Sequence, residues 1–301
     1  MEKKLICRIA QNFGNQLFMY AHAYALSKKL NYNLYIDNLS SYSNSKNFHN
    51  FHLNKLNISA KYADSNLIFE TPAKNIKRKI LKFIDKFGHK KKFCIEKFDK
   101  NKITDFFDTS QLYNYDSEFY VEGHYESEKY FVDYKEEIIK EFKIKTERNL
   151  IKNKYLEIIN NNNVVSICVR QNRFSEKNKS QFNLDKSNQF LKRTIDYIYK
   201  AINFIEKKIQ NPKYLLWSND FANLHQYFDS NRFTFVENQN DKEINDLYLL
   251  SKCKYFIVGP TTFHWWGAWL SEYNNKICVR PPDDINPSNN KSFWPESWIK
   301  L

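Results

Sequence analysis

The second half of the chain alternates short apolar runs with helical patterns, and this alternation limits the possible folds more than any other feature. Runs that are apolar throughout are typical of buried parallel strands; they are Val164–Val169, Tyr214–Ser218, Phe233–Val236, Tyr255–Val258 and Lys276–Val279. Helical patterns lie between most of them, over Lys186–Lys208, Phe221–Phe228, Glu243–Ser251 and Phe263–Ser271. This order predicts a doubly wound α/β sheet, whose ligand lies beyond the carboxyl ends of the strands.

The first half begins with a unit of the same kind. Leu5–Ala10 predicts a strand, Leu17–Leu30 a helix and Leu34–Asp37 a second strand. The loop before the helix holds residues that can present hydrogen-bond donors at a sheet edge: Asn12, Gly14, Asn15 and Gln16. A chain of 301 residues suits two domains, and an Asn-rich patch favours a boundary within residues 145–163. We therefore expect domains over residues 1–155 and 156–301.

Polar residues follow three of the predicted strands in the second half. They are Arg170–Arg173 after Val169, Ser218–Asp220 after Trp217, and Gly259–Thr262 after Val258. Arginine forms forked, charge-assisted bonds to phosphate oxygens, and a carboxylate such as Asp220 accepts from ribose hydroxyls or purine N–H groups. Because parallel strands end at one edge of a sheet, the predicted ligand is a nucleoside diphosphate derivative.

The stretch Lys254–Leu270 predicts a strand, a tight turn and a helix. Thr261 and Thr262 stand at the helix start, where backbone N–H groups and the positive end of the helix dipole favour an anionic oxygen. An ordinary cap on an aromatic core helix is the competing interpretation. Sugar faces stack on rings such as Phe263, but we favour a packing role for this aromatic block, which also contains Trp265, Trp266 and Trp269.

The charge of the chain indicates an anionic partner. The formal charge is +13 and the pI is about 9.2, which fits nucleic acid, a membrane surface or a phosphorylated substrate. The five cysteines are odd in number and include no Cys-x-x-Cys pair, which disfavours a disulfide framework or a zinc site. We find no signal-peptide core and expect a cytoplasmic protein.

The segment Lys74–Lys97 mixes many cations with apolar residues. This pattern fits a basic amphipathic helix on an anionic surface, which would place the protein at the inner face of the membrane. A solvated helix face is the more frequent origin of such a run and stays open.

Three motifs of the chain are Phe13–Ala21 (Phe-Gly-Asn-Gln-Leu-Phe-Met-Tyr-Ala), Gly123–Phe131 (Gly-His-Tyr-Glu-Ser-Glu-Lys-Tyr-Phe), and Asp246–Cys253 followed by Thr262–Leu270. They resemble motifs of glycosyltransferase family 11, the bacterial α-1,2-fucosyltransferases. The dense tryptophan pattern of the last motif is specific, and the resemblance extends over nearly the whole chain.

The resemblance implies a GT-B-like fold of two Rossmann-like domains with a cleft between them and the donor site in the C-terminal domain. It also implies an inverting transfer of L-fucose from GDP-β-L-fucose to the 2-hydroxyl of a terminal galactoside. The acceptor would be a surface-glycan precursor of O-antigen, lipopolysaccharide or capsule type, with a lipid-linked form left open. No cofactor and no obligatory metal are expected.

The chain departs from the family pattern in two places. The family's His-x-Arg-Arg-Gly-Asp motif is Cys168–Arg173 here, so only Arg170 keeps its register and carries over the diphosphate contact. Arg173 stands where the family has Asp. The first loop has Gln11-Asn12 where Gly-Gly is usual, which restricts the approach of the backbone to a donor.

Transfer with inversion requires departure of GDP and attack by an acceptor hydroxyl from the opposite face. We expect Arg170 and the helix start at Thr261 and Thr262 to stabilise the leaving diphosphate. By residue type, the candidates for a general base are His264, His124, Glu126 and Asp220. Of these we predict that His264 is catalytic, together with Arg170. Substrate contacts are predicted for Ser218, Asp220, Phe263 and the first-loop residues, and a route with little base assistance stays open.

Three other functions remain open at this stage. One is transfer of another sugar, or transfer to another position. The second is binding of nucleic acid, which the charge suggests but no reader motif supports. The third is a degenerate relative that binds a donor without turnover.

Overall fold

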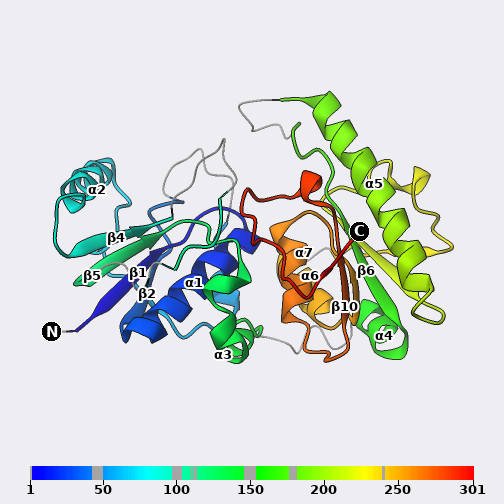
Figure 1. Cartoon of the computed structure of the whole chain (residues 1–301), viewed down its shortest axis with the longest axis horizontal. Coiled ribbons are helices and arrows are strands. Elements are labelled where there is room, and N and C mark those ends of the chain that lie inside the picture. Colours follow the sequence, from blue (N-terminus) through cyan, green and yellow to red (C-terminus); the bar gives the residue numbers. More distant parts are fainter. Residues whose placement is uncertain are drawn as a thin grey trace. The chain divides into compact units, whose positions relative to one another are not determined.

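The computed structural model describes residues 2–42, 50–96, 104–108, 110, 114–145, 154–175, 182–238 and 241–301. The chain folds into two compact units, the first comprising residues 1–145 and 288–295, the second residues 146–287 and 296–301 (Figure 1). The predicted division into 1–155 and 156–301 differs from these units in two segments, residues 146–155, which belong to the second unit, and residues 288–295. Residues 288–295 belong with the first unit, where the ring of Phe293 packs against Phe18.

The first unit is a parallel sheet flanked by helices. Its elements are β1 (Lys4–Arg8), α1 (Phe13–Leu30), β2 (Asn33–Asp37), β3 (Lys61–Tyr62), α2 (Pro72–Asp85), β4 (Lys91–Ile95), β5 (Tyr115–Glu122) and α3 (Lys135–Glu141). The strand order is β3-β2-β1-β5-β4. Ile6 lies opposite both Tyr35 and Tyr120, and Phe93 lies opposite Tyr120. Because these residues share one sheet face, they form a buried cluster there, against which Leu81 of α2 packs.

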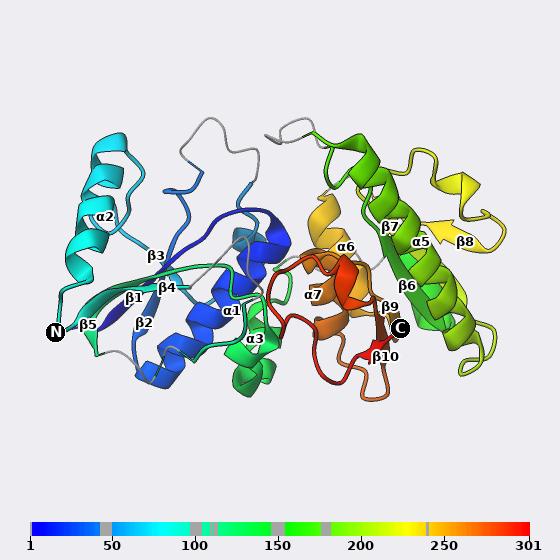
Figure 2. The ribbon, with the colours of Figure 1, turned by 45° about the horizontal axis from the view of Figure 1, so that its top comes forward.

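The second unit is a larger parallel sheet with helices on both faces (Figures 1 and 2). Its elements are α4 (Lys154–Asn161), β6 (Val164–Val169), α5 (Leu184–Glu206), β7 (Lys213–Ser218), β8 (Phe233–Phe235), α6 (Lys242–Ser251), β9 (Tyr255–Ile257), α7 (Thr262–Leu270), β10 (Ile277–Arg280) and β11 (Ile299–Lys300). The strand order is β11-β10-β9-β6-β7-β8. Helix α5 covers one face, and α6 and α7 lie on the other, which is the predicted doubly wound arrangement.

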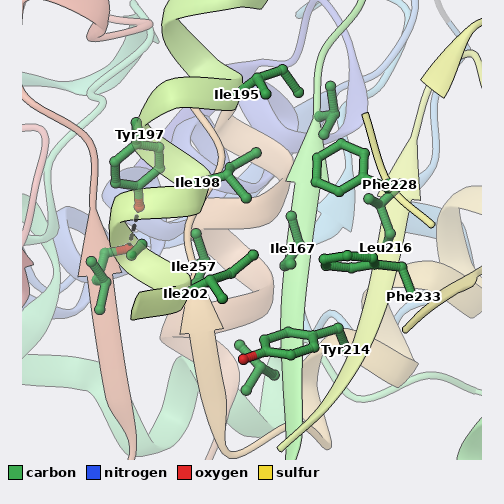
Figure 3. Packing of buried hydrophobic residues seen from close by; sticks show 14 of the residues in the cluster. Ile167, Ile195, Tyr197, Ile198, Ile202, Tyr214, Leu216, Phe228, Phe233 and Ile257 are labelled. Atoms are coloured by element: carbon green, nitrogen blue, oxygen red, sulfur yellow. Dashed lines mark hydrogen bonds between the residues drawn. The ribbon is translucent and has the colours of Figure 1, made fainter. Parts of the chain in front are cut away.

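The core under α5 is apolar and continuous (Figure 3). Ile198 and Ile202 of α5 pack over Ile167 and Ile257 of the sheet. The Tyr197 hydroxyl, which is buried with them, donates to the Val279 carbonyl at 2.7 Å. A buried hydroxyl that has a partner costs little, so α5 fixes the sheet without an unsatisfied group.

Two sequence predictions of helices were wrong in extent. Lys74–Lys97 is a helix only as far as Asp85, and the cationic run continues into the strand β4. Over Phe221–Phe228 only the short 3-10 helix Leu224–Gln226 forms, because Asn223 adopts φ 63°, which an α-helix does not allow.

The aromatic block of α7 belongs mainly to the core. The side chains of Trp265, Trp266 and Trp269 are buried, and Trp265 also packs against Trp298. Phe263 is partly exposed. All five cysteines are free and buried. Among the described residues, no helix combines the length and the apolar character needed to cross a bilayer.

Candidate active site

Three loops meet at the carboxyl edge of the second unit's sheet. Strand β6 lies between β9 and β7, so the loops that follow these strands are neighbours. The Gln171 backbone N–H donates to Asn219 Oδ1 at 2.9 Å, which joins the first loop to the second. The Arg173 guanidinium donates to the Pro260 carbonyl at 3.0 Å, which joins the first loop to the third. The polar residues that follow three separate strands in sequence therefore gather in one place.

Arg170 directly follows β6, which lies next to β9, the strand that leads to α7. Burial raises the pKa of the Cys168 thiol to about 12, and both the Thr261 hydroxyl and the Arg170 guanidinium oppose that rise. This thiol belongs to the second-last residue of β6, so both groups act near the end of that strand. A guanidinium next to a helix start is a favourable arrangement for a phosphate, because both supply N–H donors and positive charge.

Helix α7 begins at a turn that only glycine can form. A Cβ at Gly259 would lie 2.2 Å from the Cys168 carbonyl oxygen, so the turn packs directly on the end of β6. Thr261 caps the helix, since its hydroxyl accepts from the His264 N–H at 3.1 Å. Thr262 and Phe263 form the partly exposed first turn, whose backbone N–H groups point toward the N-terminal end of the helix.

His264 does not fit its predicted catalytic role. Its side chain is fully buried, and burial lowers its pKa to about 3. Its Nδ1 accepts from the Gly259 N–H at 2.8 Å, and its Nε2 lies 3.1 Å from Ser166 Oγ. Both ring nitrogens are thus used inside the fold, and the imidazole holds the turn in place.

Ser218 and Asp220 organise the loop after β7. Ser218 is buried, and its hydroxyl accepts from the Asp220 N–H at 3.2 Å. The Asp220 carboxylate accepts from the Ala222 N–H at 2.9 Å and from the Asn172 side chain at 3.3 Å. Asp220 therefore connects two of the loops, and its predicted contact with a ligand stays a prediction.

Asp246 is a member of this region that the predicted site residues omitted. The carboxylate is buried in α6, and burial raises its pKa to about 6, although the Asn238 amide donates to it at 2.6 Å. The Lys242 ammonium opposes this rise and donates to the Ser218 carbonyl at 3.2 Å. Asp246 begins one of the quoted motifs, and that position was the available signal. A buried, ionisable carboxylate next to strand ends is typical of a functional site.

The predicted residues of the first loop have partners within the first unit. Asn12 caps α1 by accepting from the Asn15 N–H at 3.3 Å, which starts the helix before the predicted Leu17. Buried Gln16 donates to the Gln11 and Asn50 carbonyls at 2.9 and 2.7 Å. Asn15 and Gly14 are buried within α1. These contacts show that Asn12 and Gln16 shape the loop. Contacts of Asn12, Gly14, Asn15 and Gln16 with a substrate remain predictions.

Gln11 itself adopts a left-handed conformation, with φ 68°. Glycine takes this conformation without cost, and the resembled family has glycine here. The loop therefore keeps the shape that a glycine would give, at a cost in backbone strain.

Two other candidate bases form a pair in the first unit. His124 Nδ1 lies 3.9 Å from the Glu126 carboxylate, and the His124 backbone N–H donates to the Glu96 carboxylate at 2.6 Å. Both side chains are partly exposed, so they keep the access to solvent that His264 lacks. Within the described parts of the chain, no three His, Cys, Asp or Glu side chains group as metal ligands would.

Comparison with known proteins identifies a matching family and two relatives that are named as glycosyltransferases. The sequence model of glycosyl transferase family 11 matches residues 3–300. An alpha-1,2-colitosyltransferase of Escherichia coli is 28% identical over 99% of this chain and 98% of its own length. The O-antigen biosynthesis glycosyltransferase WbnK of Escherichia coli is 33% identical over 36% of each chain.

A solved structure shows the same fold. NodZ alpha-1,6-fucosyltransferase, a protein from Bradyrhizobium, was soaked with GDP-fucose and superposes with a TM-score of 0.51 at 13% identity. The match covers 92% of this chain and 97% of NodZ. Two α/β units with parallel sheets are the GT-B architecture of such fucosyltransferases, as predicted.

Proposed function

Because the chain belongs to glycosyl transferase family 11, we propose that it moves L-fucose from GDP-β-L-fucose to the 2-hydroxyl of a galactoside, with inversion. That it is a glycosyltransferase follows from the family. The donor, the linkage and the acceptor are the proposed parts. The family assignment also removes the basis for the nucleic-acid alternative.

The observation that carries the donor proposal is the position of Arg170 after β6 and of α7 after the neighbouring strand β9, at the same edge of the sheet. The diphosphate of a sugar nucleotide gains negative charge as the bond to the sugar breaks. Arg170 and the α7 N–H groups, held by Gly259 and Thr261, would stabilise that charge more in the transition state than in the ground state. We propose that this stabilisation suffices without a bound cation, so EDTA should leave the rate unchanged.

Asp246 is suited to the nucleoside part of the donor. Its pKa of about 6 keeps it ionised at neutral pH, so it can accept hydrogen bonds from N–H or hydroxyl groups of a ligand. Lys242, one turn earlier on α6, lies beside it. We propose that both residues orient the donor.

Colitose is a second candidate for the transferred sugar. The relative that matches this chain over almost its entire length is a colitosyltransferase. Colitose differs from L-fucose only in lacking the 3-hydroxyl, so one site can hold either sugar unless a polar group requires that hydroxyl. Both donors give the same linkage in this proposal.

The acceptor is proposed to be a galactose-terminated O-antigen precursor. Support comes from WbnK, an O-antigen biosynthesis glycosyltransferase, which shares a third of its aligned residues with this chain. With His264 buried, we propose His124 and Glu126 as the pair to test for assistance to the acceptor hydroxyl.

The deciding experiment is a donor and acceptor panel. Purified protein is incubated with GDP-fucose, GDP-colitose, GDP-mannose or UDP-galactose, each with a β-galactoside, and the product linkage is located by NMR. A 1,2-linked product from GDP-fucose or GDP-colitose alone supports the proposal. A product from another nucleotide, or another linkage, would overturn the corresponding part.

A further inference from the structure

Helix α2 presents its apolar residues to solvent. No residue of this helix is fully buried. Its large apolar side chains are unusually exposed, together with the ring that follows the helix: Ile76 59%, Ile80 54%, Phe83 61%, Ile84 57% and Phe87 77%. At about 100° per residue these five side chains form one stripe along the helix. A contiguous apolar stripe on a folded protein marks an interaction surface.

The polar side of α2 attaches the helix to its own unit. Arg78 and Lys82 both form ion pairs with the buried carboxylate of Glu122, at the end of β5. Burial alone would raise the pKa of Glu122, but the two cations hold it below its usual value. Leu81 packs on the apolar cluster beside them. The helix is thus turned with its charged side inward and its apolar side outward, the reverse of an ordinary surface helix.

Lysines border the exposed stripe. At helical spacing Lys77 lies along one side, and Lys79 and Lys86 lie along the other. Residues 72–92 carry a large excess of positive charge, with Asp85 the one acidic residue among the cations Lys74, Lys77, Arg78, Lys79, Lys82, Lys86, Lys90, Lys91 and Lys92. Lysine stems can lie along an apolar surface while their ammonium groups reach toward anions.

We propose that α2 binds an anionic lipid bilayer, with its apolar stripe inserted among the acyl chains and its flanking lysines at the headgroups. An apolar stripe bordered by lysines matches the chemistry of an acidic membrane interface. A second copy of the chain would bring the same cations against these, which repels. A nucleic acid would neutralise the lysines but leave Phe83 and Phe87 in water. The inference goes beyond the proposed transfer reaction, and its test needs no turnover.

The experiment is flotation of the full-length protein with lipid vesicles. Vesicles of phosphatidylethanolamine and phosphatidylglycerol are compared with vesicles of phosphatidylcholine alone. The protein should float with the anionic vesicles and stay unbound with the neutral ones. Added salt should weaken the binding, because the charge contribution is screened.

The first variant pair tests the apolar stripe. Phe83→Ser combined with Phe87→Ser removes two exposed rings and should weaken partitioning by about tenfold or more. The matched control is Phe182→Ser with Leu184→Ser, which removes two side chains of 65% and 51% exposure from the second unit. The control should float like the wild type. Circular dichroism checks that each variant is folded.

The second pair tests the lysines. Lys77→Gln, Lys79→Gln and Lys86→Gln together should weaken binding to anionic vesicles by roughly a hundredfold. Lys192→Gln and Lys200→Gln on α5, with Lys207→Gln at its C-cap, change the net charge equally and should change binding little. Equal losses from both triple variants would mean that net charge alone drives binding, and would overturn the proposal.

Further outcomes would also overturn the proposal. The wild-type protein could fail to float, or the Phe83→Ser/Phe87→Ser variant could float like the wild type. Another such outcome is concentration-dependent dimerisation in sedimentation that the same variant abolishes, which would show that a second copy covers the stripe. If transfer activity is absent but α2-dependent flotation is seen, the membrane proposal stands and the proposed function fails.

Discussion

The Nε2 atom of His264 lies 3.1 Å from the hydroxyl oxygen of Ser166, on the strand beneath it. Because His264 Nδ1 accepts from the Gly259 N–H, the ring proton is on Nε2 and points to Ser166. The Ser166 hydroxyl in turn donates to the Tyr255 carbonyl at 3.4 Å. A neutral imidazole thus connects the turn before α7 with the centre of the sheet.

Stability of the second unit between pH 7 and 5 depends on two opposing groups. His264, with a pKa of about 3, stays neutral when folded but takes a proton when unfolded, so stability falls as the pH drops below about 6.5. Asp246, with a pKa of about 6, takes up a proton at a higher pH in the folded state than in the unfolded state. Stability therefore rises as the pH drops below about 6. We expect a net loss below about 1 kcal/mol in the wild type and a loss of about 2 kcal/mol in Asp246→Asn.

Denaturant titrations followed by tryptophan fluorescence measure this difference. Most tryptophans, including Trp265, Trp266 and Trp269, lie in the second unit, so the signal follows that unit. His22→Gln, in the first unit, serves as the control and should leave this transition unchanged. Equal losses in wild type and Asp246→Asn would contradict the raised pKa of Asp246.

Asp246→Asn should stabilise the protein and lower its activity. At pH 7 the buried carboxylate is ionised at a cost, and an amide of the same size removes that cost, for a gain of up to about 3 kcal/mol. Transfer should fall at least about tenfold, because an ionised acceptor for the donor is lost. Thermal unfolding and initial rates test both effects. A variant that is less stable, or fully active, would show that Asp246 has a structural role only.

Gly259→Ala should prevent normal folding of the turn before α7. The added methyl group would lie 2.2 Å from the Cys168 carbonyl oxygen and 3.0 Å from its carbonyl carbon, and these backbone atoms leave it no space. We expect a loss of about 3 kcal/mol or more. Gly88→Ala is the comparison, since its Cβ would meet the nearest backbone oxygen at 3.1 Å in an exposed turn. Unfolding is followed by circular dichroism, which reports on both units, and equal stability for both variants would contradict the assigned close packing.

Substitution of Arg170 should lower activity, whereas substitution of Arg173 should lower stability. Arg170→Lys loses the forked contact to a phosphate, and kcat/KM should fall by about a hundredfold with little change in Tm. Arg173→Lys loses guanidinium bonds to the Pro260 and Pro287 carbonyls, so it should cost about 1–2 kcal/mol of stability. Steady-state rates measured well below both unfolding temperatures distinguish the two. If Arg170→Lys lowered stability and Arg173→Lys lowered activity, the roles assigned to the two arginines would be wrong.

Local sequence patterns predicted the strands and most helices because continuous apolar runs and helical spacing persist in the folded chain. β6 was predicted with the observed limits, and the cap at Thr261 was placed correctly. The start of α1 was missed, because a single side-chain bond from Asn12 extends the helix by more than a turn. Local composition could not reveal that bond.

Long-range contacts explain what the sequence left open at the site. His264 has the residue type of a base, but its partner Ser166 is distant in sequence, so its burial was not visible. Asp246 becomes unusual only when folding buries its carboxylate and raises its pKa. The ion pairs that turn α2 outward likewise join helix residues to Glu122 at the end of a distant strand.

The return of residues 288–295 to the first unit means that no single cut in the chain yields both halves intact. A fragment ending at Lys145 would lack Phe293, whose buried ring packs against α1, and would expose Phe18 to solvent. The remaining piece would carry Phe293 and Trp294, two buried rings, without the first unit that covers them. Each half should therefore be soluble only when the two are produced together.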